Sequence, residues 1–142
     1  MNDIITTIVG NAVSEVVLRS SSSGKSMATF RIANNPRRFE KTSNSWIELD
    51  PNFVSINCWS FLAENVATSV RKGQPLVVTG KLKIRQWQDG EKSGTAVELD
   101  AISVGHDLNW GKSEFTKVKK TSSNTANDAW FPEGLDAEVN VA

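Results

Sequence analysis

The chain has 142 residues, of which 39% are hydrophobic and 23% charged, so it suits one folded domain with a core and is short for two. Its formal net charge is zero, which excludes an overall basic character as the basis of nucleic-acid binding. The single cysteine, Cys58, excludes an intrachain disulfide and gives no support to a cysteine-based metal site, and no apolar run approaches the roughly 20 residues of a membrane span.

Charge is distributed unevenly along the chain. Residues 1–111 carry a net charge of +1, residues 112–126 of +3 and residues 127–142 of −4. From residue 112 the sequence is rich in Ser, Thr and Asn without a sustained period, which predicts a flexible C-terminal tail after a domain over residues 1–111. Because that domain is nearly neutral, binding charge must be concentrated on one of its faces. No signal-peptide pattern opens the chain, so we expect a cytoplasmic protein.

The first part of the chain predicts β-strands. Residues 4–9 are a β-branched run, which Gly10 and its neighbour are expected to end with a turn or bulge. Residues 27–33 alternate between apolar and polar side chains, so Phe30 should enter the core and Arg31 should point outward.

A projecting hairpin is predicted over residues 37–49, with its tip at residues 42–45, because Pro36 ends the preceding strand. Basic residues mixed with aromatics on a long hairpin suit the grasping of a nucleic-acid strand. The alternative is a solvated loop whose aromatic side chains fold back onto the body. The candidate binding residues here are Arg37, Arg38, Phe39, Lys41 and Trp46.

The next strand, over residues 53–59, has two unlike faces. Phe53 and Trp59 lie on an outer face that is otherwise Ser and Asn. Two large aromatics on a polar face indicate either a subunit interface or a platform on which bases stack. The other face is small and apolar and should enter the core: Val54, Ile56 and Cys58.

One helix is predicted, over residues 60–73, with Ser60 capping its start and Gly73 closing its end. The strand over residues 76–87 follows. On its outer face the strand carries Lys81, Lys83, Arg85 and Trp87. Its other face, with Leu82, Ile84 and Gln86, is expected to pack into the core. Cations in a row can follow phosphates, although lysines on an edge strand also serve simply to block unwanted pairing.

A last strand over residues 96–104 completes five strands, with one helix between the third and the fourth, which is the order of an OB-fold, a five-stranded Greek-key barrel. An enzyme is disfavoured. His106 is the only histidine and should be structural, and the spaced acids Glu48/Asp50 and Glu98/Asp100 suit solvated strand faces better than a catalytic pair. We expect no metal and no cofactor.

In its first 110 or so residues the chain resembles the bacterial single-stranded DNA-binding protein family. The order and spacing of several pieces carry the resemblance: Val9-Gly10-Asn11, Phe53-Val54-Ser55-Ile56, Trp59 with Leu62-Ala63-Glu64, Arg71-Lys72-Gly73, Val78-Thr79-Gly80-Lys81-Leu82 and Arg85-Gln86-Trp87.

The resemblance implies a homotetramer that wraps single-stranded DNA, with bases stacked on Phe53, Trp59 and Trp87. A further family aromatic falls near Arg38 or Phe39, depending on how the loop is aligned, and Phe39 is the candidate. Phe53 stands where the family usually has tryptophan. Family members dedicated to replication usually end in an acidic tip with a Pro-Phe pair, which recruits replication and repair proteins. That motif is missing here, so the chain resembles a short-tailed paralogue whose recruitment of such partners is in doubt.

Residues and resemblance together predict a protein that binds single-stranded DNA with little sequence preference, in replication, recombination and repair at the nucleoid. Arg31, the hairpin arginines and the cations of residues 81–85 would neutralise phosphates. The alternative is an OB-fold adaptor, such as a primosome component, whose aromatic face holds protein or RNA.

Overall fold

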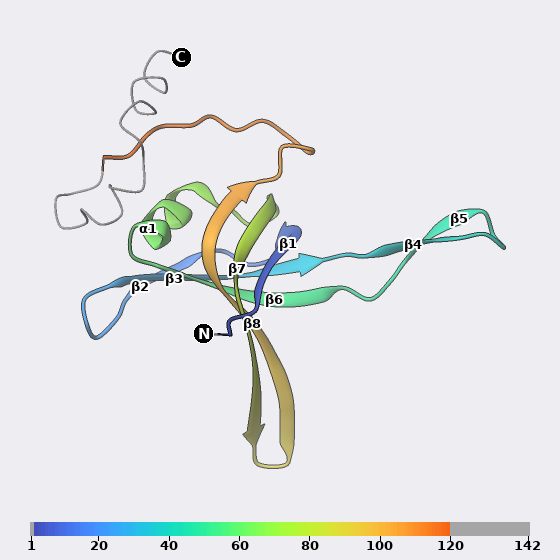
Figure 1. Cartoon of the computed structure of the whole chain (residues 1–142), viewed down its shortest axis with the longest axis horizontal. Helices are drawn as coiled ribbons and strands as arrows, with labels where there is room; N and C mark the ends of the chain where they lie inside the picture. Colours follow the sequence, from blue (N-terminus) through green and yellow to red (C-terminus); the bar gives the residue numbers. More distant parts are fainter. Residues whose placement is uncertain (1, 120–142) are drawn as a thin grey trace.

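A computed structural model of the chain describes residues 2–119. This part of the chain contains eight strands and one helix (Figure 1): β1 Ile5–Ala12, β2 Val17–Ser20, β3 Ser26–Asn34, β4 Arg37–Glu40, β5 Ser45–Glu48, β6 Asn52–Trp59, α1 Ser60–Ser69, β7 Pro75–Asp89 and β8 Lys92–His106. Residues 112–119 form neither strand nor helix, and the rest of the predicted tail lies outside the described residues.

Six strands form one sheet in the order β1-β7-β8-β6-β3-β2, and β4 pairs with β5 in a separate hairpin. A short additional pairing of β1 with β3 connects two strands that stand far apart in that order. The pairing of β6 with β8 is parallel and the other pairings are antiparallel. The strands β1, β3, β6, β7 and β8, with α1 between the third and the fourth, match the predicted OB-fold order.

The core lies between the inner faces of these strands and α1. Ile32, Ile56, Leu76 and Leu99 are fully buried, each from a different strand. Phe30 is also buried, as alternation along β3 predicts. The inward face of β6 is confirmed as well, because its three predicted core residues are all buried: Val54, Ile56 and Cys58.

Gly10 does not end the first strand, contrary to the sequence prediction. The strand β1 continues to Ala12 and changes its partner, since residues 5–11 pair with β7 and residues 11–12 pair with β3. At that crossing a Cβ on Gly10 would overlap the carbonyl oxygen of Ala33 and lie 2.6 Å from Cγ2 of Ile32. Glycine is therefore required here by the close approach of another strand.

The helix is shorter than predicted and is capped differently. It ends at Ser69, and Ser60 is its first residue, without a side-chain capping hydrogen bond. At the other end, Nη1 of Arg71 donates to the carbonyl oxygens of Ala67 and Val70 at 2.9 and 3.1 Å. Gly73 follows in a turn at φ +93° and donates its N–H to Ala12, so it serves the contact with β1 rather than the helix end.

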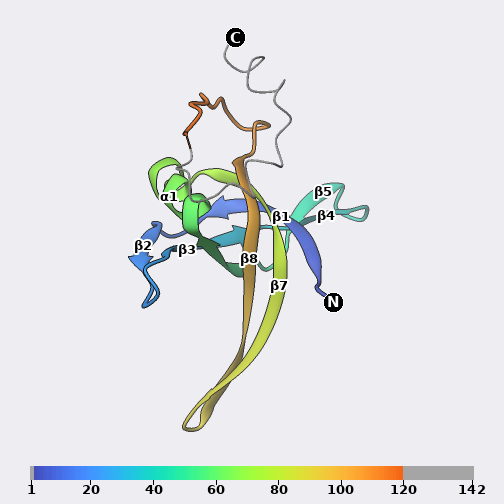
Figure 2. The same cartoon turned by 60° about the vertical axis from the view of Figure 1, so that its left-hand side comes forward.

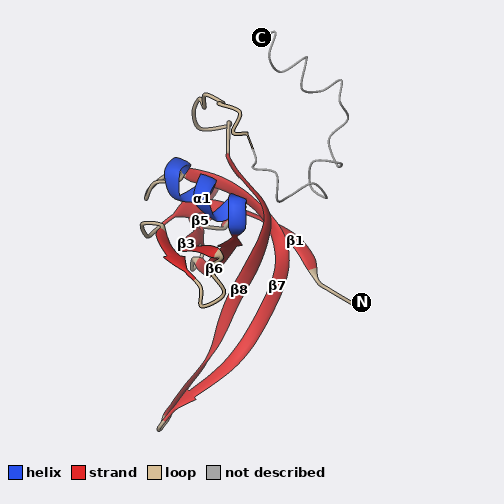
Figure 3. Cartoon of the chain, turned by 90° about the vertical axis from the view of Figure 1, so that its left-hand side faces the viewer, coloured by secondary structure: helices blue, strands red, loops and turns tan. Residues whose placement is uncertain are grey.

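Two hairpins extend from the body. One is β4–β5, as predicted from residues 37–49, and the other is the outer half of β7 and β8 (Figures 1 and 2). Seen from the side, β7 and β8 continue well past the other strands (Figure 3). The prediction that the second face of β7 enters the core is therefore wrong beyond Leu82, because Ile84 is 60% exposed and Gln86 is exposed too. Within residues 2–119, no other helix or strand packs against this part of the hairpin to cover these side chains.

Candidate nucleic-acid interface

The strand register brings seven of the predicted binding residues to one curved surface. Lys83 stands opposite Glu98, Glu98 opposite Ser55, and Ser55 opposite Arg31, across β7, β8, β6 and β3. Directly paired residues point to the same side of a sheet, and side chains two apart share that side. The outer face, as we call this surface, therefore carries Arg31, Phe53, Trp59, Lys81, Lys83, Arg85 and Trp87.

Three aromatic side chains of the outer face are each about half exposed, at 47% for Phe53, 43% for Trp59 and 45% for Trp87. A half-exposed ring is anchored on one side and free on the other, which is what stacking on a planar ligand requires. The guanidinium of Arg31 lies 5.1 Å from the centre of the Phe53 ring, in a cation–π contact. Arg31 thereby adds positive charge directly beside one of the aromatic surfaces.

The indole of Trp87 packs against a glycine on the neighbouring strand of the hairpin. Trp87 stands opposite Gly94 in the β7–β8 ladder. A Cβ built on Gly94 would lie 2.6 Å from Cζ2 and 2.9 Å from Nε1 of Trp87, so the ring occupies the space that a side chain at position 94 would need. Gly94 was not singled out from the sequence, because the partner of Trp87 is known only once the strands are paired.

Each of the three cations of β7 is paired with a carboxylate. The Nζ of Lys83 lies 2.6 Å from Oδ2 of Asp100, Nε of Arg85 lies 3.6 Å from Oε2 of Glu98, and Nζ of Lys81 lies 3.5 Å from Oδ2 of Asp3. The hydrogen bond and charge of Asp100 raise the pKa of the Lys83 ammonium above its usual value. The spaced acids of β8 thus lie on the outer face itself, a placement that sequence reasoning missed.

The β4–β5 hairpin presents its own aromatic pair. Phe39 and Trp46 stand opposite each other, with ring centres 5.5 Å apart in an edge-to-face arrangement. Both rings remain substantially exposed, so they contact each other and do not fold back into the body. The same hairpin holds the remaining predicted cations: Arg37, Arg38 and Lys41.

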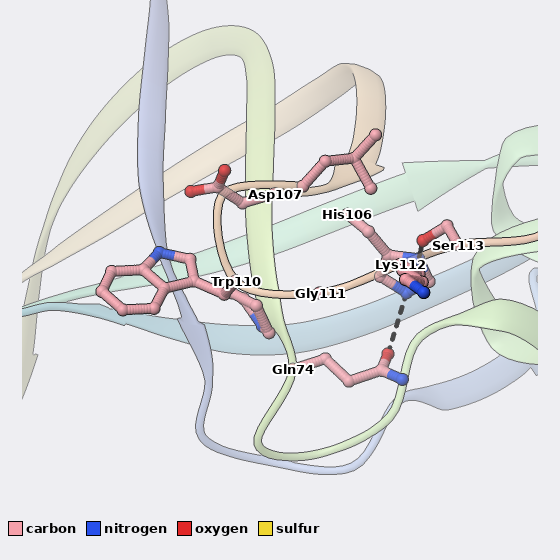
Figure 4. A pocket seen from close by; sticks show the side chains of 9 residues that line it. Gln74, His106, Asp107, Trp110, Gly111, Lys112 and Ser113 are labelled. Carbon is pink, nitrogen blue, oxygen red and sulfur yellow. Dashed lines mark hydrogen bonds between the residues drawn. The ribbon is translucent and has the colours of Figure 1, made fainter.

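His106 lies away from the outer face, at a cavity of about 100 Å³ where β7 begins and β8 ends (Figure 4). Its Nδ1 is 2.7 Å from Oγ of Ser113 and its Nε2 is 3.0 Å from Oε1 of Gln74. The second contact is to an amide, whereas a nucleophilic triad would have a carboxylate there. Residues 2–119 contain no cluster of three potential metal ligands and no helix long and apolar enough to cross a membrane.

A model of the single-strand binding protein family matches residues 1–107 of the chain, which include all strands and the helix of the described residues. The chain belongs to this family. The assignment confirms the resemblance inferred from the spaced sequence pieces, and it supports the expectation that the chain is not an enzyme.

Curated relatives in the family are similar in sequence over most of the chain. The chain is 38% identical over 122 residues to a single-stranded DNA-binding protein of Corynebacterium glutamicum, covering 84% of this chain and 54% of that protein. It is 39% identical over 121 residues to single-stranded DNA-binding protein 2 of Streptomyces coelicolor, covering 84% and 59%. The chain therefore spans less than two thirds of the length of these two relatives.

Solved structures in the family share the fold. A crystal structure of a small single-stranded DNA-binding protein from Streptomyces coelicolor matches with a TM-score of 0.71 and 33% identity, covering 78% of this chain and 100% of that one. The second single-stranded DNA-binding protein of Mycobacterium smegmatis matches with a TM-score of 0.62 and 28% identity, covering 82% and 100%. Both likenesses support the OB-fold assignment.

Proposed function

We propose that the chain binds single-stranded DNA with little sequence preference and so protects exposed strands in replication, recombination and repair. The observation that carries the proposal is the outer face, on which three half-exposed aromatic rings stand beside four cations. The relatives named above as single-stranded DNA-binding proteins support the same ligand.

The mechanism combines two kinds of contact. Bases stack on Phe53, Trp59 and Trp87, at about 1–3 kcal/mol per stacked base, and any base serves because each has a flat π-face. Arg31 and the three cations of β7 neutralise backbone phosphates, so the affinity should fall as salt rises. The β4–β5 hairpin extends the binding surface with Phe39 and Trp46, flanked by its own cations: Arg37, Arg38 and Lys41.

A homotetramer is the assembly we propose for this function. Between Ile5 and Ile8 the strand β1 has one strand neighbour, β7, among the described residues, so its other edge is open to pairing there. Ile5 and Val9 are exposed on the same strand. Light scattering coupled to gel filtration should give four times the 15.6 kDa chain mass. A monomer at micromolar concentration would contradict the assembly.

The proposed ligand, single-stranded DNA, suggests where the protein would work and which proteins it would meet. A protein that coats single strands would work in the cytoplasm, at the nucleoid, beside replication and repair proteins. The residues that would recruit them are proposed to lie in residues 127–142, which are acidic and contain Trp130 and Phe131.

A second candidate function is an adaptor that holds protein on the outer face. It is favoured by one observation, the pairing of the three cations of β7 with carboxylates from other segments. This pairing leaves the surface along β7 close to neutral. A neutral surface with exposed aromatic rings suits a protein partner as well as a nucleic acid.

Titration with oligo(dT), followed by tryptophan fluorescence, decides between these two functions. Stacking should quench strongly, and the logarithm of the affinity should fall with the logarithm of the salt concentration by about 0.7 per phosphate neutralised. A Trp59→Ala/Trp87→Ala variant should lose most of the quenching. The matched control is Trp110→Ala, which removes an exposed indole beside the His106 cavity. Equal binding of duplex DNA, or no quenching by oligo(dT), would favour the adaptor.

A further inference from the structure

We propose that Glu98 and Asp100 determine the selectivity of the outer face for single strands over duplex DNA. In the free protein these two carboxylates neutralise Lys83 and Arg85, so the attraction of this part of the outer face for phosphates is weakened. Only a strand whose bases can reach the aromatic rings then binds tightly. The proposal rests on the proposed function and assigns a role to two residues that the stacking mechanism does not use.

The carboxylates are fixed more firmly than the cations they face. The side chains of Asp100 and Glu98 are 23% and 24% exposed, whereas those of Lys83 and Arg85 are 60% and 67% exposed. Asp100 also accepts a hydrogen bond of 3.3 Å from Nδ2 of Asn57 on β6. The acids therefore belong to the sheet surface, and the cations are the mobile partners that can turn away toward a ligand.

The positive charges on the outer face of β7 are balanced by an equal number of carboxylates. Lys81 is paired with Asp3, Lys83 with Asp100 and Arg85 with Glu98. A phosphate that takes a cation from this strand must replace a carboxylate, and the released carboxylate then lies near the phosphate and repels it. Since one anion is exchanged for another, each phosphate contact with these cations gains less free energy than a contact with an unpaired cation would.

Base stacking is independent of that exchange. In a single strand the bases can turn onto Phe53, Trp59 and Trp87, so the ligand gains free energy that the carboxylates do not oppose. In a duplex the bases are already paired and stacked on each other, and only phosphates are offered to the outer face. A duplex carries about twice the phosphate charge per unit length of a single strand, so the negative charge of the two acids opposes a duplex more than a single strand. The acids thus reduce duplex binding more than single-strand binding.

A Glu98→Gln/Asp100→Asn variant tests the inference, because the amides keep the shape of the side chains and remove both charges. At about 50 mM salt we expect the affinity for a duplex to rise about tenfold, and that for oligo(dT) of equal length by less than about threefold. The salt slope for the duplex should steepen by about 0.9 for each phosphate newly neutralised. The matched control is Glu64→Gln/Glu114→Gln, with the same change in charge on α1 and the C-terminal segment.

The outcomes separate this inference from the proposed function. If wild-type protein binds oligo(dT), and the double variant gains duplex and single-strand affinity by equal factors or gains neither, the inference is overturned and the proposed function stands. If wild-type protein fails to bind oligo(dT), the proposed function fails, and the inference with it. Should the double variant unfold, Glu98→Gln alone serves, because Glu98 makes a single 3.6 Å ion pair; a smaller preferential gain for duplex is then the supporting result.

Discussion

Trp87 covers Gly94 on the outer half of the β7–β8 hairpin, and the two residues form one binding element. The ring takes the place of the missing side chain, so the strand surface supports one side of the indole while 45% of the residue stays exposed. Aromatic cover of a strand glycine fixes the ring without adding body beneath the hairpin. A stacking surface can therefore be held in position on a part of the hairpin that lies outside the core of the described residues.

Gly94→Ala should weaken oligo(dT) binding although it removes no ligand contact. The added methyl group displaces the indole of Trp87, so the affinity should fall by part of the loss caused by Trp87→Ala, which we expect to be about 1–3 kcal/mol. Fluorescence titration measures both. Gly105→Ala is the control, because a Cβ at position 105 meets no atom within 4 Å. Wild-type affinity in Gly94→Ala would show that the packing of Trp87 on Gly94 does not contribute to oligo(dT) binding.

Gly80→Ala should destabilise the fold. The register shifts between Thr79 and Gly80, and there a Cβ on Gly80 would overlap the carbonyl oxygen of Asp100 and lie 2.8 Å from its carbonyl carbon. Because backbone atoms cannot move aside cheaply, we expect a loss of about 1–3 kcal/mol or more in the free energy of unfolding. Denaturant titration measures the loss. Gly111→Ala, with open space around it, should leave stability unchanged.

Cys58 should make the protein sensitive to alkali. Burial raises the pKa of the Cys58 thiol from 9.0 to about 12. Its folded-state pKa is above the unfolded value, so the stability from the neutral thiol is complete below pH 9 and is lost as the pH rises toward about 12. The loss approaches about 1.4 kcal/mol per pH unit, because unfolding then releases a proton.

The comparison of wild type with Cys58→Ala isolates this contribution. The alanine variant loses some packing at neutral pH, but the difference in stability between the two proteins should narrow by about 1 kcal/mol between pH 7 and about pH 10. Urea unfolding at the two pH values measures it. Parallel pH dependence in both proteins would mean that other groups cause the alkaline loss.

Trp46→Ala should lower the affinity for oligo(dT) with little change in thermal stability, because Trp46 is 65% exposed on the β4–β5 hairpin. The expected loss is about 1–3 kcal/mol if a base stacks on this ring. Phe39→Ala should cost a similar amount, because each ring orients the other. Leu108→Ala removes an equally exposed apolar side chain from the C-terminal segment and serves as the control. Unchanged affinity in Trp46→Ala would limit the binding surface to the outer face.

The alternation of side chains along each strand could be read from the sequence alone. It placed Val54, Ile56 and Cys58 inside and Phe53 and Trp59 outside, as the structure has them. This works because a β-strand turns successive side chains to opposite sides whatever its neighbours are. The succession of strands along residues 2–119, with one helix after the third long strand, could be predicted for the same reason, since it depends on local patterns taken in sequence.

Only the tertiary structure decided which residues lie opposite each other across the strands, and how far each strand extends beyond the core. A period of two says which side a residue faces, but not which residue lies opposite, so the contacts of Lys83 with Asp100 and of Trp87 with Gly94 had no local signal. Nor does it say where a strand leaves the body, which is why Ile84 has a core pattern and is exposed. The sequence around Gly10 predicts a turn for the same reason, because the strand that crosses it lies more than twenty residues away in the chain.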